Sequence, residues 1–327
     1  MVWVEFIAAS AILVLTASQL ARFSDIIAIR TKLGGMFIGT LLLAGATSLP
    51  EMLTSINSFQ QGVPNLAAGN FFGSNLFNMF MLALLDLANQ QSRILRQVAM
   101  RHALTAGLAI LLISSTILFI QLNLDWKIGW VGIDSLVLMA IYFGGIRLLR
   151  GNSTPPPPDE QAIDAKLPSL RYALIGFAIA TLVLVLIAPW LVSSSTRIAE
   201  ITGLGTGFVG ILLVGLVTSL PEMVTTISAA RMGAYDLAVG NLFGSNIFNI
   251  FALGFADLFL TSGRFLGAID PAFALAGMIG LVMTSLALVG NLARLERRLW
   301  IIELDALLLV LVYIGGMWVL YSRGIGA

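Results

Sequence analysis

Hydrophobic residues in this chain gather into long runs that are separated by short polar segments. Each run is close to the roughly 20 residues that a helix needs to cross a bilayer. Ten expected membrane-spanning helices lie at about 3–21, 35–60, 65–88, 103–121, 128–149, 170–192, 205–230, 236–260, 270–292 and 300–321. The pattern therefore predicts an all-α integral membrane protein with ten transmembrane helices.

The composition supports this fold class and narrows the possible functions. Hydrophobic residues make up 58% of the 327 positions and charged residues only 11%, a balance that a water-soluble domain would have difficulty solvating. A net charge of +1 gives no reason to expect nucleic acid, and a chain without cysteine has no thiolate metal site or thiol nucleophile. No nucleophile stands beside a base in the sequence, so we do not expect an enzyme. We also expect no cofactor and no obligate protein partner. The surroundings are expected to be membrane lipid.

The chain carries two copies of one pattern. The pentapeptide TSLPE stands at 47–51 and again, letter for letter, at 218–222, and neighbouring segments match without a gap at the same offset. Each half holds five expected spans, and because five is an odd number, the second copy enters the membrane from the opposite side. We therefore expect two inverted five-helix repeats. They cover 1–150 and 170–327, with the repeated motifs inside 39–87 and 210–258.

Residues 151–169 form the expected linker between the two repeats. Its four consecutive prolines and acidic flank favour an extended stretch that cannot enter lipid. Most of the 18 Lys and Arg residues lie on the linker side of the expected spans. The positive-inside tendency then predicts a multi-pass protein of the inner or plasma membrane, with a cytoplasmic linker and both termini outside. The basic residues on the other side are Lys127, Arg197, Arg264 and Arg323.

A glutamate follows a proline inside an expected span in each repeat. Glu51 and Glu222 are costly in a membrane unless a partner offsets the charge, and Pro50 and Pro221 each remove a helix hydrogen bond. Carboxylates, freed carbonyls and hydroxyls form an all-oxygen set that suits hard cations such as Ca²⁺, whereas zinc or copper would ask for His or Cys. The alternative, a proline kink with an incidental glutamate, is disfavoured because it would have to occur twice. The hydroxyls beside the glutamates belong to Thr47, Ser48, Thr218 and Ser219.

The next span in each half carries a second repeated pattern, GNxxGSNxxN, at 69–78 and 240–249. Residues three or four apart share a helix face, so each copy presents a stripe of asparagine, serine and asparagine. We expect this stripe to supply ligands, although the same groups alternatively only join helices. The expected ligands are Ser74, Asn78, Ser245 and Asn249. Asn75 and Asn246 point elsewhere and are expected to satisfy backbone groups.

Four aspartates also match between the repeats. We expect Asp86 and Asp257 at helix ends within reach of water. Asp134 and Asp305 begin spans, where structural pairing or helix N-terminal placement is expected rather than transport.

At these motifs the chain resembles the cation/calcium exchanger superfamily, and within it the prokaryotic sodium/calcium exchangers. The resemblance covers the whole chain and implies ten spans in two inverted fives, with the first and sixth spans sliding as a gate. It also implies a central calcium site between Glu51 and Glu222 with oxygens from Thr47 and Thr218. The sodium sites and the middle of the site would add Ser48, Ser74, Ser219, Ser245, Asn78, Asn249 and the carbonyls near Ala44 and Gly215. One departure is the amide of Asn249, where these exchangers often have an aspartate.

The expected function is secondary antiport of Ca²⁺ against Na⁺ by alternating access. One Ca²⁺ or two protons would neutralise the two motif glutamates, whereas three Na⁺ would leave a positive charge. A proton-coupled exchanger of Ca²⁺ or another divalent cation is therefore the main alternative. A cation channel lined by the same oxygens is a further one, which unitary currents would reveal.

Overall fold

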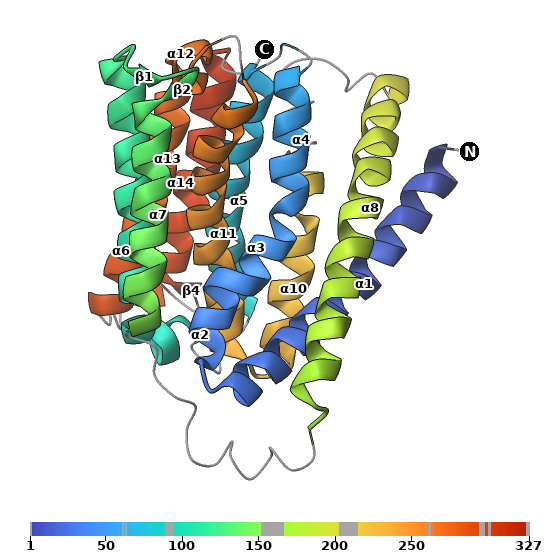
Figure 1. The fold of residues 1–327 in the computed structure, drawn as a ribbon. Coiled ribbons are helices and arrows are strands. Elements are labelled where there is room, and N and C mark those ends of the chain that lie inside the picture. The colour runs from blue at the N-terminus through green and yellow to red at the C-terminus, as the bar shows by residue number, and fades with distance from the viewer. Residues whose placement is uncertain are drawn as a thin grey trace.

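The computed structural model describes residues 2–60, 62, 64–88, 94–151, 167–202, 215–260, 263–293, 298–299 and 302–324. It is a bundle of long helices, with the N- and C-termini at one end of the bundle (Figure 1). The first half contains α1 (Val2–Thr31), α2 (Gly34–Ile38), the π-helical turn η1 (Gly39–Leu43), α3 (Ala44–Thr47), α4 (Leu49–Gln60), α5 (Pro64–Ala88), α6 (Ile94–Leu122), β1 (Lys127–Ile128), β2 (Val131–Gly132) and α7 (Ile133–Gly151). The second half contains α8 (Leu170–Thr202), α10 (Leu220–Arg231), α11 (Tyr235–Ala256), the 3₁₀ turn η4 (Asp257–Phe259), α12 (Phe265–Ala268), α13 (Phe273–Ala293), β3 (Arg298–Leu299), β4 (Ile302–Glu303) and α14 (Leu304–Ser322).

The predicted all-α membrane fold is confirmed. Within the described residues, seven helices are long and apolar enough to cross a membrane, and the bent pair formed by 34–47 and 49–58 makes up to eight. Of the other two expected spans, 128–149 corresponds to the 19-residue α7. The span at 205–230 is described only from residue 215 onward, as a short helical turn followed by α10.

The backbone repeats itself at the offset found in the sequence. Ser48 interrupts its span with φ −88° and ψ 4°, and Ser219 does so with φ −85° and ψ 4°. The antiparallel pair β1–β2 precedes α7, and β3–β4 precedes α14 with the same register one repeat later. The two halves therefore share local irregularities as well as helices, as expected of a duplicated chain.

The motif-bearing helices α5 and α11 lie at the centre of the bundle. In each, 72% of the most apolar stretch is buried, against 28% in α1. Glycine permits the closest packing here: a Cβ placed on Gly244 would lie 2.5 Å from the Cα of Thr40 in η1. This close approach brings the bent α2–η1–α3–α4 segment of one repeat against the motif helix of the other.

The pair α1 and α8 lies along one flank of the bundle, where both helices run obliquely beside each other (Figure 1). A small cluster of Ala9, Leu13, Ile187 and Leu191 joins them to Val217, next to the second TSLPE. Arg30, near the end of α1, donates to the carbonyls of Leu167 at 2.6 Å and Pro168 at 3.1 Å, just before α8 begins. The two long helices are thus fastened to each other at the end of the bundle opposite to the termini.

The aspartates at the span ends have structural roles. Asp134 forms an ion pair with Arg264 and also accepts from the backbone N–H of Ser135, so the expected structural pairing is confirmed. The expectation that Asp257 and Asp86 are open to water is wrong, because their exposed fractions are 0% and 4%. Asp257 accepts from the N–H of Gly132 at 2.8 Å, which ties the β1–β2 turn over the helix end and excludes solvent.

Candidate cation site

Each TSLPE segment forms a break inside its span. The two parts around Ser48 meet at an angle of 40°, and Pro50 and Pro221 stand in the first turn of the helices that follow. Proline suits that position because it has no N–H to leave unpaired. The break places Glu51 and Glu222 in the first turn of α4 and α10, deep in the bundle.

The two glutamates are buried and face each other across the repeats. Their exposed fractions are 0% and 1%, and they lie close enough to repel each other when both are ionised. The hydroxyl of Ser48 donates to Oε1 of Glu222 at 2.8 Å, and that of Ser219 lies 3.3 Å from Oε1 of Glu51. Each carboxylate is therefore held by the serine of the opposite TSLPE.

Several buried oxygens of the two repeated motifs have no hydrogen-bond partner among the described residues. They are Glu51 Oε2, Glu222 Oε2, Asn78 Oδ1, Asn249 Oδ1 and Ser245 Oγ. All five belong to residues that the sequence singled out, and a buried oxygen without a partner is costly. A bound cation can satisfy an oxygen that lacks a hydrogen-bond donor. This arrangement therefore fits a hard cation such as Ca²⁺ or Na⁺.

Four asparagines orient the amide oxygens. Asn78 Nδ2 donates to Asn246 Oδ1 at 3.0 Å, and Asn249 Nδ2 donates to Asn75 Oδ1 at 3.0 Å. The side-chain amides of Asn78 and Asn249 thereby each donate a hydrogen bond to the opposite repeat, and their oxygens remain available to bind a cation. Asn246 also donates to the backbone carbonyl of Asn75, as expected, whereas the contact of the Asn75 side chain with Asn249 was not foreseen.

Sequence reasoning placed Asn70 and Asn241 in the polar stripe but not among the site residues. Asn70 Nδ2 donates to the backbone carbonyl of Glu51 at 3.2 Å, and Asn241 Nδ2 donates to that of Glu222 at 3.3 Å. Asn70 Oδ1 accepts from the hydroxyl of Thr218 at 3.0 Å, and Asn241 Oδ1 lies 3.4 Å from that of Thr47. Each asparagine thus links the glutamate of its own repeat to the threonine of the other.

These contacts also occupy the two threonines and the two candidate carbonyls. The carbonyl of Ala44 accepts from the N–H of Ser48 at 3.0 Å and lies 3.2 Å from the hydroxyl of Thr47. The carbonyl of Gly215 lies in the same relation to Ser219 and Thr218, at 3.1 Å for both. Each carbonyl therefore already accepts a backbone hydrogen bond, and the threonine hydroxyl beside it can donate to only one of its neighbours at a time. Ser74 is placed beside Ser219, with the two hydroxyl oxygens 2.9 Å apart.

A hollow of about 250 Å³ reaches the region of the break from one side. It is lined by Pro50, Leu53, Thr54 and Asn57 of α4 and by residues of α8 around Pro189. Its polar lining residues are Thr54 and Asn57 on α4 and Ser193 on α8. The hollow therefore lies between α4 and α8 beside the break, and neither glutamate lines it.

A model of the family described as "Sodium/calcium exchanger protein" matches residues 1–149 and 172–322. The chain belongs to this family. It is 26% identical over 332 residues to the "Putative antiporter CaxA" of Alkalimonas amylolytica, covering 95% of this chain and 96% of that one. It is also 48% identical over 92 residues to the "Sodium/calcium exchanger MaX1" of Methanosarcina acetivorans, covering 26% of each chain.

The fold resembles solved structures of the sodium-calcium exchanger NCX_Mj. One of them, soaked with Na⁺ and Sr²⁺, aligns with a TM-score of 0.72 at 22% sequence identity and covers 97% of this chain and 99% of that one. Both repeats contribute to the family match, and the ten expected spans fit this architecture. Members of the family are transporters and not enzymes, so the chain is a multi-pass membrane transporter for cations.

Proposed function

We propose that this chain exchanges Ca²⁺ against Na⁺ across the membrane, with the ions bound between Glu51 and Glu222. The observation that carries the proposal is the pair of buried carboxylates, each held through one oxygen by the opposite repeat while the other oxygen has no partner in the described structure. Such a pair suits one divalent cation, because its two charges balance two carboxylates. The partner-free oxygens of Asn78, Asn249 and Ser245 would complete much of the shell of about 6 to 8 ligands that Ca²⁺ takes.

The same site would hold sodium when calcium leaves. Hydroxyl and carbonyl oxygens at Ser48, Ser74, Ser219, Thr47, Thr218, Ala44 and Gly215 surround the glutamates on both sides, as the resemblance to the exchangers implies. Two ions that compete for one pair of carboxylates cannot both be bound fully, which couples the exit of one to the entry of the other. Matching breaks at Ser48 and Ser219 in inverted repeats are typical of transporters with alternating access.

The direct test is uptake of radioactive calcium into proteoliposomes at clamped voltage. One set of vesicles carries an outward sodium gradient, a second carries an outward proton gradient without sodium, and a third carries neither. Sodium-driven uptake that exceeds the third set supports the proposal, and the double variant E51Q/E222Q should abolish it. Absence of calcium uptake in every set would overturn calcium antiport altogether.

Proton coupling is the second candidate, and one observation favours it. The central site has two motif carboxylates, and the position where related exchangers often have an aspartate is the amide Asn249. Two protons balance two carboxylates, whereas three sodium ions would leave an excess positive charge in a buried site. Uptake in the proton-gradient vesicles alone would replace sodium by protons in the proposal.

We also propose that both termini lie outside the cell membrane and that the linker is cytoplasmic. The excess of basic residues on the linker side supports this orientation. A cysteine introduced in the linker of this cysteine-free chain should react with a membrane-impermeant maleimide only after the cells are opened. Labelling of intact cells would reverse the orientation.

A further inference from the structure

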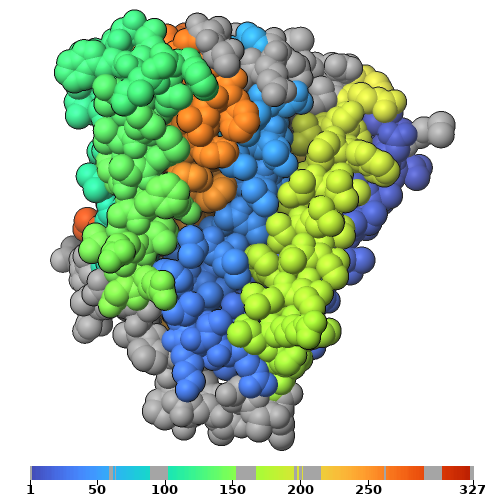
Figure 2. All heavy atoms as spheres, in the orientation of Figure 1, coloured from blue at the N-terminus to red at the C-terminus, as the bar shows by residue number. Residues whose placement is uncertain are grey.

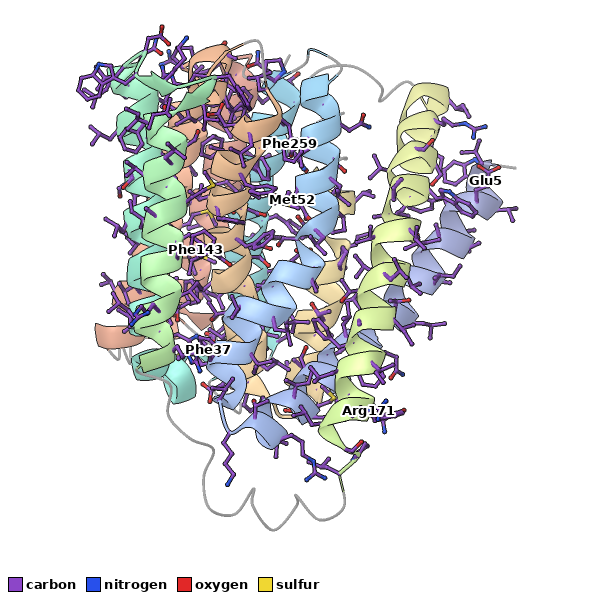
Figure 3. The ribbon with its side chains drawn as sticks, in the orientation of Figure 1. Glu5, Phe37, Met52, Phe143, Arg171 and Phe259 are labelled. Carbon is purple, nitrogen blue, oxygen red and sulfur yellow. The ribbon has the colours of Figure 1, made fainter. Side chains whose placement is uncertain are left out.

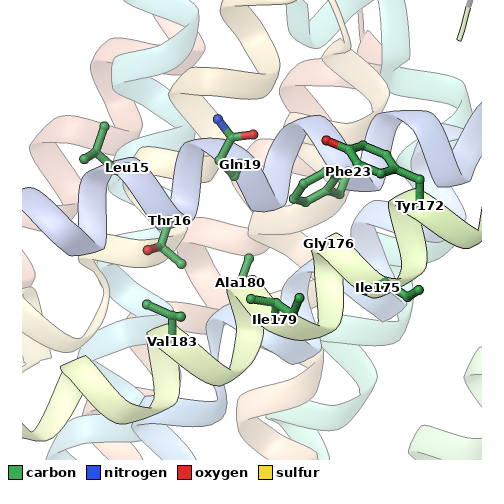
Figure 4. A pocket seen from close by; sticks show the side chains of 10 residues that line it. All are labelled: Leu15, Thr16, Gln19, Phe23, Tyr172, Ile175, Gly176, Ile179, Ala180 and Val183. Carbon is green, nitrogen blue, oxygen red and sulfur yellow. The ribbon is translucent and has the colours of Figure 1, made fainter. Parts of the chain in front are cut away.

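An apolar groove runs along the outer face of the α1–α8 pair, away from the cation site. It has a volume of about 420 Å³ and lies between Leu15 and Phe23 on α1 and Tyr172, Ile179 and Val183 on α8. Figure 4 shows these side chains on both sides of the groove between the two helices. Gly176 of α8 lies next to Phe23 of α1. Figure 2 shows the outer side of α8 uncovered along most of its length.

The groove lies on the membrane-spanning part of α1 and α8 and is exposed, so it faces lipid. Leu15 is 70% exposed, Ile179 58% and Tyr172 57%. On α8 the groove extends from Tyr172 to Val183, which is about 16 Å at 1.5 Å per residue. Half of a hydrocarbon core about 30 Å thick is about 15 Å. The groove therefore has the length of one acyl chain in one leaflet.

The two ends of the α1–α8 pair differ in charge. At the end near the termini, Arg197 pairs with Glu5 at 3.3 Å, so these charges balance each other. At the other end, Arg22 and Arg171 are exposed and form no ion pair within the described part of the chain. Figure 3 shows Glu5 and Arg171 at these opposite ends.

Each arginine lies next in sequence to an aromatic residue that lines one end of the groove. Arg22 precedes Phe23 and Arg171 precedes Tyr172, and the rings of Phe23 and Tyr172 contact each other edge to face with centroids 5.8 Å apart. Long arginine side chains reach along apolar surface to place their guanidinium groups at the headgroup level. A guanidinium group binds a phosphate through two parallel hydrogen bonds.

We propose that this groove is a binding site for an anionic phospholipid. One acyl chain lies between α1 and α8, and the phosphate is bound by Arg22 and Arg171. The site depends neither on the coupling ion nor on the position of the carboxylates. Because the lipid contacts both helices, it stabilises the packing of the first span of one repeat against the first span of the other.

The test is native mass spectrometry of the full-length chain, extracted with its lipids and re-exposed to phosphatidylglycerol or to phosphatidylcholine. The parent should retain one phosphatidylglycerol at concentrations where phosphatidylcholine is lost, and the variant R22Q/R171Q should bind it at least tenfold more weakly. The matched control is R147Q, which removes an exposed arginine from the same end of α7, outside the groove. Glycerophosphoglycerol, the headgroup without chains, should not displace the lipid.

The outcomes separate the alternatives. Equal retention of both lipids in the parent, or equal retention of phosphatidylglycerol in R22Q/R171Q and R147Q, would overturn the proposal. Displacement by glycerophosphoglycerol would also overturn it, because the groove would then contribute nothing. A melting temperature of R22Q/R171Q without added lipid that equals that of the parent shows that the variant is folded.

Discussion

The two copies of TSLPE are identical in sequence, yet their serines are held differently. Ser48 donates to Glu222 at 2.8 Å, whereas Ser219 lies 3.3 Å from Glu51 and 2.9 Å from Ser74. A hydroxyl has one proton to donate, so Ser219 can donate to only one of these two neighbours at a time. Ser245, the counterpart of Ser74, has no hydrogen-bond partner among the described residues. Identical pentapeptides therefore give the two carboxylates unequal surroundings.

The comparison also shows what the two repeats share. Serine, threonine and asparagine each contact a residue of the other repeat, so neither half forms the site alone. A buried polar network of this kind is stable only when each member has its partner. Substitutions at equivalent positions should therefore have effects of the same kind but of different size, and the difference measures how far the symmetry holds.

The largest effect is expected from the carboxylates. In E51Q or E222Q the remaining glutamate cannot by itself offset the dehydration of a divalent ion. Breaking a buried charge interaction costs about 3 to 5 kcal/mol, so calcium affinity should fall at least about 100-fold. Calcium binding to each purified variant, together with vesicle uptake, measures this. The exposed Glu5 is a matched control, and near-normal exchange in either site variant would remove the central assignment.

Acid should weaken calcium binding in the parent protein. Protons and Ca²⁺ compete for the same two carboxylates, since a ligand must be deprotonated to bind a metal. Proton binding at the site therefore opposes calcium binding, and the calcium affinity should fall as the pH is lowered from about 8 to about 5.5. Titration by equilibrium binding at fixed sodium checks this. A flat affinity over the whole interval would contradict the role of the glutamates as the shared site.

Substitutions of Asn70 and Asn241, which link each glutamate to the threonine of the other repeat, should also differ in the size of their effect on stability. Asn241 donates to Thr225, Thr226 and the carbonyl of Glu222, whereas Asn70 donates to Ser55 and the carbonyl of Glu51. An unsatisfied buried group costs about 1 to 3 kcal/mol, so each alanine variant should lose roughly tenfold in calcium affinity. N241A leaves more groups without a partner and should also lower thermal stability more. Equal stabilities for N241A and N70A would show that the extra bond of Asn241 contributes nothing.

The glutamates and the asparagines show which parts of the site sequence alone could predict. Repetition of TSLPE identified Glu51 and Glu222, because a costly residue that occurs twice in a membrane span needs a shared reason. The partner of Asn70 could not be read in the same way, because it depends on the distance between segments 148 positions apart in the chain. Burial of Asp257 likewise depends on the β1–β2 turn that folds over it, which no local pattern announces.

The serines on α5 and α11 offer a finer test. Ser74 bonds Ser219 in the structure, so S74A should lower ion-free stability by about 1 kcal/mol. Ser245 has no hydrogen bond to lose, so S245A should leave ion-free stability unchanged and lower ion affinity a few-fold. Thermal unfolding with and without calcium distinguishes these expectations. If S245A instead destabilises the ion-free protein as much as S74A does, the two repeats are more alike than their hydrogen bonds indicate.

The smallest change in affinity, and the most specific change in coupling, is expected from N249D. Asn249 donates to Asn75 Oδ1, and a carboxylate at this position has no proton to donate. Asn75 Nδ2 has no partner among the described residues, so the Asn75 amide can turn over and donate to the new carboxylate. The substitution should therefore be tolerated while adding a third negative charge beside Glu51 and Glu222. That charge should recruit a further monovalent cation, so the sodium dependence of calcium uptake should become steeper. The sodium Hill coefficient and the calcium affinity, measured in N249D and in the parent, decide the point. If Asn249 only joins helices, stability falls while both quantities stay unchanged, and Asn249 and its counterpart Asn78 leave the set of proposed ligands.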